Sequence, residues 1–89
     1  MKAIVTVIGK DRVGIIADVC AALAAQNVNV LDISQTVLQD YFTMMMMVDT
    51  EGCAVSFKEL AELLRDRGEK KGLVIRIQRE DIFEAMHRI

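Results

Sequence analysis

Residues 28–48, VNVLDISQTVLQDYFTMMMMV, predict two consecutive strands in the middle of the chain. The first twelve alternate well enough for a strand, with Leu31, Ile33 and Val37 on one parity. Asp40 then predicts a tight turn into a second strand of eight residues. Four consecutive methionines would suit a helix equally well, but their aromatic and β-branched flanks and the hairpin context favour a strand. This segment therefore predicts a β-hairpin.

A helix is predicted on each side of this hairpin. The first extends from about Val13 to Gln26, with apolar residues at helical spacing, and Asn27 suits a left-handed helix end. The second begins at Ser56–Glu59, SFKE, which is a capping box, and Gly68 suits its end. The order helix, hairpin, helix predicts two crossover connections with the hairpin between them.

Two further strands complete the pattern, at Lys2–Ile8 and Leu73–Gln78. The order β-α-β-β-α-β predicts an α+β ferredoxin-like sandwich, in which a four-stranded antiparallel sheet carries two helices on one face. We expect one domain over residues 1–89, with a core at 1–79 and a short C-terminal helix within the tail 80–89. The apolar residues of that tail at helical spacing are Ile82, Met86 and Ile89.

The composition excludes several classes of protein. With 53% hydrophobic and 27% charged residues, the chain is globular, and 89 residues suffice for one domain. A net charge of −2 and a pI of about 5.3 disfavour nucleic acid as a partner. Cys20 and Cys53 fit no metal spacing, so we expect no metal and no cofactor. Neither a signal sequence nor a membrane span is predicted, so we expect a soluble cytoplasmic protein with no membrane partner.

The sheet face without helices is the first functional indication. Both parities of the strands at 2–8 and 41–48 are apolar, whereas a solvent-facing side should be polar. An apolar surface of this extent indicates a binding face. A second subunit, the C-terminal helix or a partner protein could cover it, and we favour self-association into a homodimer or a higher homo-oligomer.

The sequence contains no recognisable grouping of catalytic residues. The lone histidine, His87, lies near the end of the chain, and Cys20 lies on the apolar stripe of the first helix. Cys53 has Glu51 rather than a cation nearby, which gives no reason for a reactive thiolate. The loop at 9–14 is only a faint echo of the phosphate loop of an acylphosphatase. We therefore predict that the protein is not an enzyme.

One loop carries the features of a ligand site. Gly9–Gly14, GKDRVG, joins a central strand to a helix N-terminus, whose free N–H groups attract carboxylates. Asp11 adds a negative charge suited to an ammonium group, so the loop fits an amino acid. The alternative is that Asp11 simply caps the helix. Nearby polar groups are expected from Asn27, Asn29 and Asp32, whose other roles are helix termination and edge solvation.

These residues resemble those of a known family. GKDRVGIIADV at 9–19, followed by NVNVLDISQ at 27–35, resembles ACT domains, in particular small stand-alone ones that also resemble half of the glycine-cleavage transcriptional repressor. The resemblance implies pairing between domains and sensing of a small molecule, often an amino acid bound at a domain interface. It implies the following ligand-binding residues: Asp11, Arg12, Val13, Gly14, Ile15, Asn27, Asn29 and Val30.

Two functions remain open from the sequence. The first is a homo-oligomeric regulatory domain that binds an amino acid near residues 9–14. The alternative is a protein-interaction module that docks on a separate enzyme or regulator without binding a metabolite. A small enzyme of the acyl-phosphate type is a third and weaker hypothesis.

Overall fold

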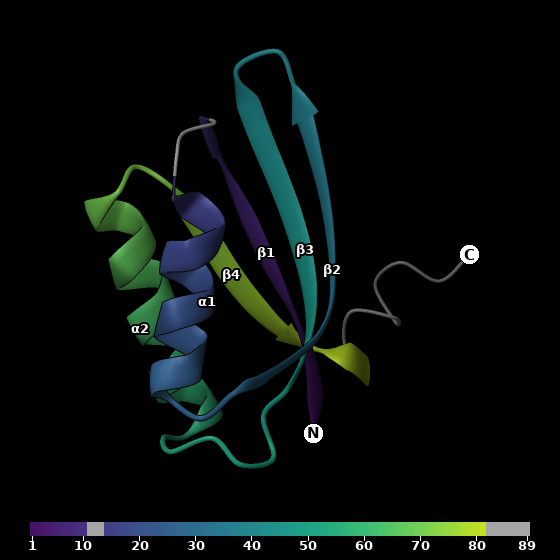
Figure 1. Ribbon diagram of the computed structural model, residues 1–89. Helices are drawn as coiled ribbons and strands as arrows, with labels where there is room; N and C mark the ends of the chain where they lie inside the picture. The colour runs from purple at the N-terminus through teal and green to yellow at the C-terminus, as the bar shows by residue number, and fades with distance from the viewer. Residues whose placement is uncertain (11–13, 82–89) are drawn as a thin grey trace.

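The structure is a computed structural model that describes residues 1–10 and 14–81. Its elements follow the predicted β-α-β-β-α-β order (Figure 1): β1 Lys2–Lys10, α1 Ile15–Ala25, β2 Asn29–Leu38, β3 Tyr41–Asp49, α2 Phe57–Lys70 and β4 Val74–Arg79. The sheet is antiparallel with strand order β2-β3-β1-β4. The ferredoxin-like fold is confirmed. Of the predicted C-terminal helix, Glu80 and Asp81 are helical, and residues 82–89 lie outside the described residues.

The core lies between the sheet and the two helices, which pack on the same side of the sheet (Figure 1). Alternate residues of β3 enter it, since Met44 and Met46 are fully buried whereas Met45 is 37% exposed. Leu23 of α1 and Leu64 of α2 are also fully buried in this core. The methionine run is therefore a strand with period-two burial, as the hairpin context predicted.

Both helices end in a left-handed residue followed by return hydrogen bonds. Asn27, at φ 60°, ends α1 as predicted, and the N–H of Val28 donates to the carbonyl of Leu23 at 3.0 Å. In α2 the predicted stop at Gly68 is wrong, because the helix continues to Lys70 and Gly72 adopts the left-handed conformation, at φ 71°. Gly68 is required for packing instead, since a Cβ there would lie 2.8 Å from the Leu73 carbonyl oxygen.

One half of the predicted capping box at the start of α2 is present, because Ser56 caps the helix, whereas the Glu59 carboxylate accepts from the Ser56 hydroxyl at 3.2 Å instead of the Ser56 backbone N–H. The N–H of Glu59 donates to Oγ of Ser56 at 3.2 Å, and Ser56 is the N-cap. Replacing Ser56 by alanine leaves that N–H without its partner, and we expect a loss of about 1 kcal/mol of folding free energy. Chemical denaturation measures this, with Ser34→Ala on an exposed strand as the control. A loss equal to that of the control would contradict the capping role.

The edge strand β2 is exposed along most of its length. Of the two helices, α2 packs against β4, whereas α1 contacts β2 and leaves most of that strand exposed. The register shifts between Val30 and Asp32, which makes Leu31 the extra residue of a bulge. The predicted shared parity of Leu31, Ile33 and Val37 is therefore wrong at Leu31. Ile33 and Val37 pair with core residues of β3 and so lie on the helix side of the sheet, at 41% and 51% exposed.

The opposite face of the sheet also carries exposed apolar residues, as predicted. Ile8, Tyr41 and Val74 are 45%, 57% and 51% exposed there. Within the described part of the chain, no helix is both long and apolar enough to cross a membrane.

Candidate functional site

An open groove of about 600 Å³ lies beside the N-terminus of α1. The start of α1 forms one wall, and the hairpin end of β2 and β3 forms the other. Its lining residues are Gly14, Ile15, Ile16, Ala17, Gln35, Val37 and Phe42. Two of the predicted ligand residues, Gly14 and Ile15, therefore lie at a concave surface.

The helix end at this groove has no side-chain cap among the described residues. Gly14 is the N-cap, with φ 91° and ψ 0°, which only glycine adopts without strain. The first intrahelical hydrogen bond runs from the N–H of Asp18 to the Gly14 carbonyl at 2.9 Å. The N–H groups of residues 15–17 precede it and have no partner within the helix. The helix begins at Ile15, later than predicted, and Asp11, Arg12 and Val13 lie outside the described residues.

The rest of the groove combines apolar side chains with one amide. Phe42 is 4% exposed and Val37 51% exposed, and the two are register partners across the hairpin. Gln35 lies two residues along β2 on the same face and supplies an amide that can donate and accept. N–H groups that have no partner within their helix, beside an apolar wall, suit a small molecule with a carboxylate at one end.

The other predicted ligand residues lie at the far end of α1. A helix of eleven residues is about 17 Å long, and it separates Gly14 from Asn27. Asn29 is exposed at the start of β2, opposite Asp49 on β3, and Val30 is half-buried against the core. One chain therefore does not bring Asn27, Asn29 and Val30 to the groove.

Asn27 has a structural role in this position. Its Nδ2 donates to the carbonyl of Gly52 at 2.9 Å, and a Cβ on Gly52 would lie 2.9 Å from that nitrogen. The interaction ties the end of α1 to the loop before α2. The helix-termination role that the sequence left open for Asn27 is confirmed.

The charged state of Asp49, beside Asn29, is set by local donors. Its pKa is lowered first by the hydrogen bond from the N–H of Glu51, at 3.0 Å, and further by the N-terminal ammonium at 3.5 Å. The carboxylate is thus ionised at neutral pH, at the end of β2 remote from the groove.

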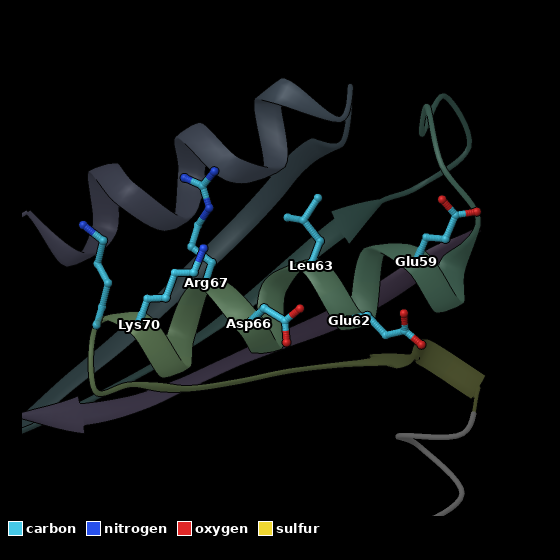
Figure 2. Close-up of a pocket in the computed structure, with 7 residues that line it drawn as sticks. Glu59, Glu62, Leu63, Asp66, Arg67 and Lys70 are labelled. Carbon is cyan, nitrogen blue, oxygen red and sulfur yellow. The ribbon is translucent and has the colours of Figure 1, made fainter.

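A second groove, of about 610 Å³, lies along α2 (Figure 2). Glu59 and Glu62 lie toward the N-terminal end of the helix and Arg67 and Lys70 toward the other end, which complements the helix dipole. Lys71 Nζ also pairs with Asp18 on α1 at 3.1 Å. These charges are solvated and lie in order along one helix, so they form a polar helix surface rather than a site.

Groups for metal or thiol chemistry do not come together in residues 1–10 and 14–81. No cluster of three His, Cys, Asp or Glu side chains that could hold a metal occurs there. Cys20 and Cys53 are free thiols that pack against the core.

Sequence reasoning did not identify Gln35, Val37 and Phe42 as site residues. Val37 was recognised only as part of a strand. The available signal was the hairpin register, which places Val37 opposite Phe42, but the approach of the hairpin end to α1 is a tertiary feature.

Comparison with known proteins agrees with this fold. Residues 2–78 match the family described as ACT domain. A UPF0237 protein of Clostridium acetobutylicum is 53% identical over 89 residues, which is 100% of both chains. An ACT domain protein from Streptococcus pneumoniae has a TM-score of 0.83 at 45% identity, covering 98% of each chain. A protein described as a glycine cleavage system transcriptional repressor matches 86% of this chain over 44% of its own, with a TM-score of 0.73; at 19% identity this shows the fold alone.

Proposed function

The chain belongs to the ACT domain family, and from that premise we propose that it is a non-catalytic regulatory domain that binds an amino acid between two copies of itself. The observation that carries the proposal is the N-terminus of α1, which no side chain of the described residues caps and which opens into the groove. The N–H groups of residues 15–17 suit the ligand carboxylate. Val37 and Phe42 suit an apolar side chain, and Asp11 supplies the charge for the ammonium.

The position of β2 supports pairing with a second copy. β2 is an edge strand, and an exposed edge offers unpaired backbone groups to another strand. A two-fold axis that sets two β2 strands side by side and antiparallel brings the Asn29 end of one copy to the Leu38 end of the other. Val30 of one copy then comes close to Val37 of the other, on the helix side that carries the groove, and Asn29 lies at the same end of the seam on the other sheet face. In this arrangement the predicted ligand residues at the two ends of α1, one end from each copy, form one composite site.

Exposed side chains on the helix side favour the same pairing. Ile33 is 41% exposed, Val37 51% and Ile16, on α1, 36%. They form an apolar strip between α1 and β2 that nothing in the described chain covers. A two-fold axis beside β2 places two such strips next to each other and removes them from water, which stabilises the dimer.

A thermal-shift screen of the full chain against the twenty amino acids tests the function. A ligand at about 100 times its dissociation constant stabilises the fold by roughly 2.7 kcal/mol, which moves the midpoint of a domain this small by several degrees. We expect one amino acid, or a few of related structure, to do so. If none shifts a well-folded protein, amino-acid binding is wrong and the docking-module alternative takes its place, with the exposed strip as the docking surface.

The dimer makes a separate prediction. We expect Ile33→Asp to convert the dimer to a monomer, because a carboxylate at the centre of the seam loses its hydration without a partner. Light scattering measures the mass, and circular dichroism verifies the fold. Thr43→Asp, on β3 and on the other face, is the control and should remain dimeric. A dimer that survives Ile33→Asp would contradict pairing through β2.

A further inference from the structure

The sheet surface opposite the helices, here called the open face, carries an apolar patch near the hairpin turn. Its residues alternate along each strand with those of the core. Ile8 of β1 and Val74 of β4 are register partners and are 45% and 51% exposed. Tyr41 and Leu38 of the hairpin are also partners and are 57% and 72% exposed. These four residues lie in neighbouring rows of the sheet and are called the hairpin-end patch.

Two cations flank this patch. Lys10 follows Ile8 by two residues on β1, and each such step along a strand is about 7 Å. Arg76 follows Val74 in the same way on β4. Because β1 and β4 run antiparallel, the two cations lie on opposite sides of the Ile8–Val74 pair. Both are exposed, and within residues 1–10 and 14–81 no carboxylate forms an ion pair with either.

The carboxylates that the described strands place on this face lie toward its other end. Asp32 is four residues before Thr36, which shares a row with Ile8, so it lies about 13 Å along β2 from that row. Asp49, the last residue of β3, is farther still and is paired with the N-terminal ammonium at 3.5 Å. Asp40 lies in the hairpin turn and belongs to no strand. On the strands around the hairpin-end patch, the charges are therefore cationic.

A second copy does not match this surface. Two open faces packed patch against patch bring Lys10 and Arg76 of both copies together, and like charges repel. If one copy is turned end for end, the cations approach Asp32 and Asp49, but the apolar patch then lies against charged residues. A partner of different chemistry can satisfy both requirements.

We propose that the hairpin-end patch docks an amphipathic helix of a separate protein. The apolar stripe of that helix covers Ile8, Tyr41 and Val74, and carboxylates beside the stripe pair with Lys10 and Arg76. A sheet face buries apolar side chains readily against a helix, as the other face of this sheet does against α1 and α2. The rim charges orient the helix and disfavour basic partners. This surface is separate from the amino-acid site, which lies on the helix side of the sheet.

Two synthetic helical peptides with the same leucine stripe test the proposal on the full chain. One carries glutamates beside the stripe and the other carries lysines at the same positions, and fluorescence anisotropy measures the binding of each. Ile8→Asp removes the centre of the patch. Ala24→Asp, which adds the same charge at an exposed position of α1, is the matched control. Lys10→Glu combined with Arg76→Glu reverses the rim charge, and circular dichroism verifies the fold of each variant.

We expect the glutamate peptide to bind at least about tenfold more tightly than the lysine peptide, and the double charge reversal to invert that preference. Ile8→Asp should weaken binding at least about tenfold, and Ala24→Asp should retain it. No binding, equal affinity for the two peptides, or a preference that the charge reversal leaves unchanged would overturn the proposal. Self-association that Ile8→Asp abolishes would also overturn it, because it would identify a second copy as the occupant. So would tighter binding of a single-stranded oligonucleotide than of the glutamate peptide.

Discussion

Replacing Met46 by alanine is expected to lower the free energy of unfolding by about 3 kcal/mol, within the range of 2–5 kcal/mol for such core truncations. Met46 is fully buried between the sheet and the helices, so the lost side chain leaves a cavity. Met45, its neighbour, lies on the open face at 37% exposed. We expect Met45→Ala to cost about 1 kcal/mol or less.

Thermal denaturation followed by circular dichroism separates the two variants. For a domain of this size 1 kcal/mol corresponds to a shift of about 4–8 °C, so the loss of about 3 kcal/mol in Met46→Ala should lower the midpoint by roughly 12–24 °C. Met44→Ala should resemble Met46→Ala, because Met44 is also fully buried. Equal losses at Met45 and Met46 would contradict the period-two burial of β3.

The element order was predictable because each element carries a local signal. The Ser56 helix cap, the left-handed Asn27 and the turn at Asp40 are determined by residues close in sequence, and the structure confirms the element boundaries to within a few residues. Gly68 was misassigned because two glycines four residues apart can both end a helix. Gly72 takes the left-handed position, and Gly68 instead packs closely against Leu73 and Ile75.

The candidate site was less predictable for a geometric reason. In the sequence the loop at 9–14 precedes α1 and the start of β2 follows it. Within one chain the length of α1 therefore separates the two. The groove wall from Val37 and Phe42 depends on hairpin register, and the bulge at Leu31 changes which side chains of β2 face the helices. A single sequence does not specify the bulge, and the seam proposed above is inferred only from the exposed side chains on the helix side of β2.

Mixing two binding-deficient variants is expected to restore binding if the site is composite. We expect Asp11→Ala and Asn29→Ala each to abolish binding of the amino acid found by screening, because the proposed site takes Asp11 from one copy and the Asn29 end of β2 from the other. In a mixed dimer, one site combines both altered residues, and the other combines two native ones. With random exchange half of the dimers are mixed, so about a quarter of all sites recover.

Isothermal titration of the co-expressed variants, carrying different tags, measures this as a stoichiometry. The number of amino-acid molecules bound per chain should rise from zero for either variant alone to about 0.25 in the random mixture and about 0.5 in the purified mixed dimer. The affinity of the recovered sites should equal that of the native protein, because those sites contain no altered residue. The same variants combined in one chain provide the control, since a dimer with both changes in every chain has no native site. If binding does not recover in the mixed dimer, each site lies within a single chain, and Asn29, about a helix length from Gly14, acts there only through the fold.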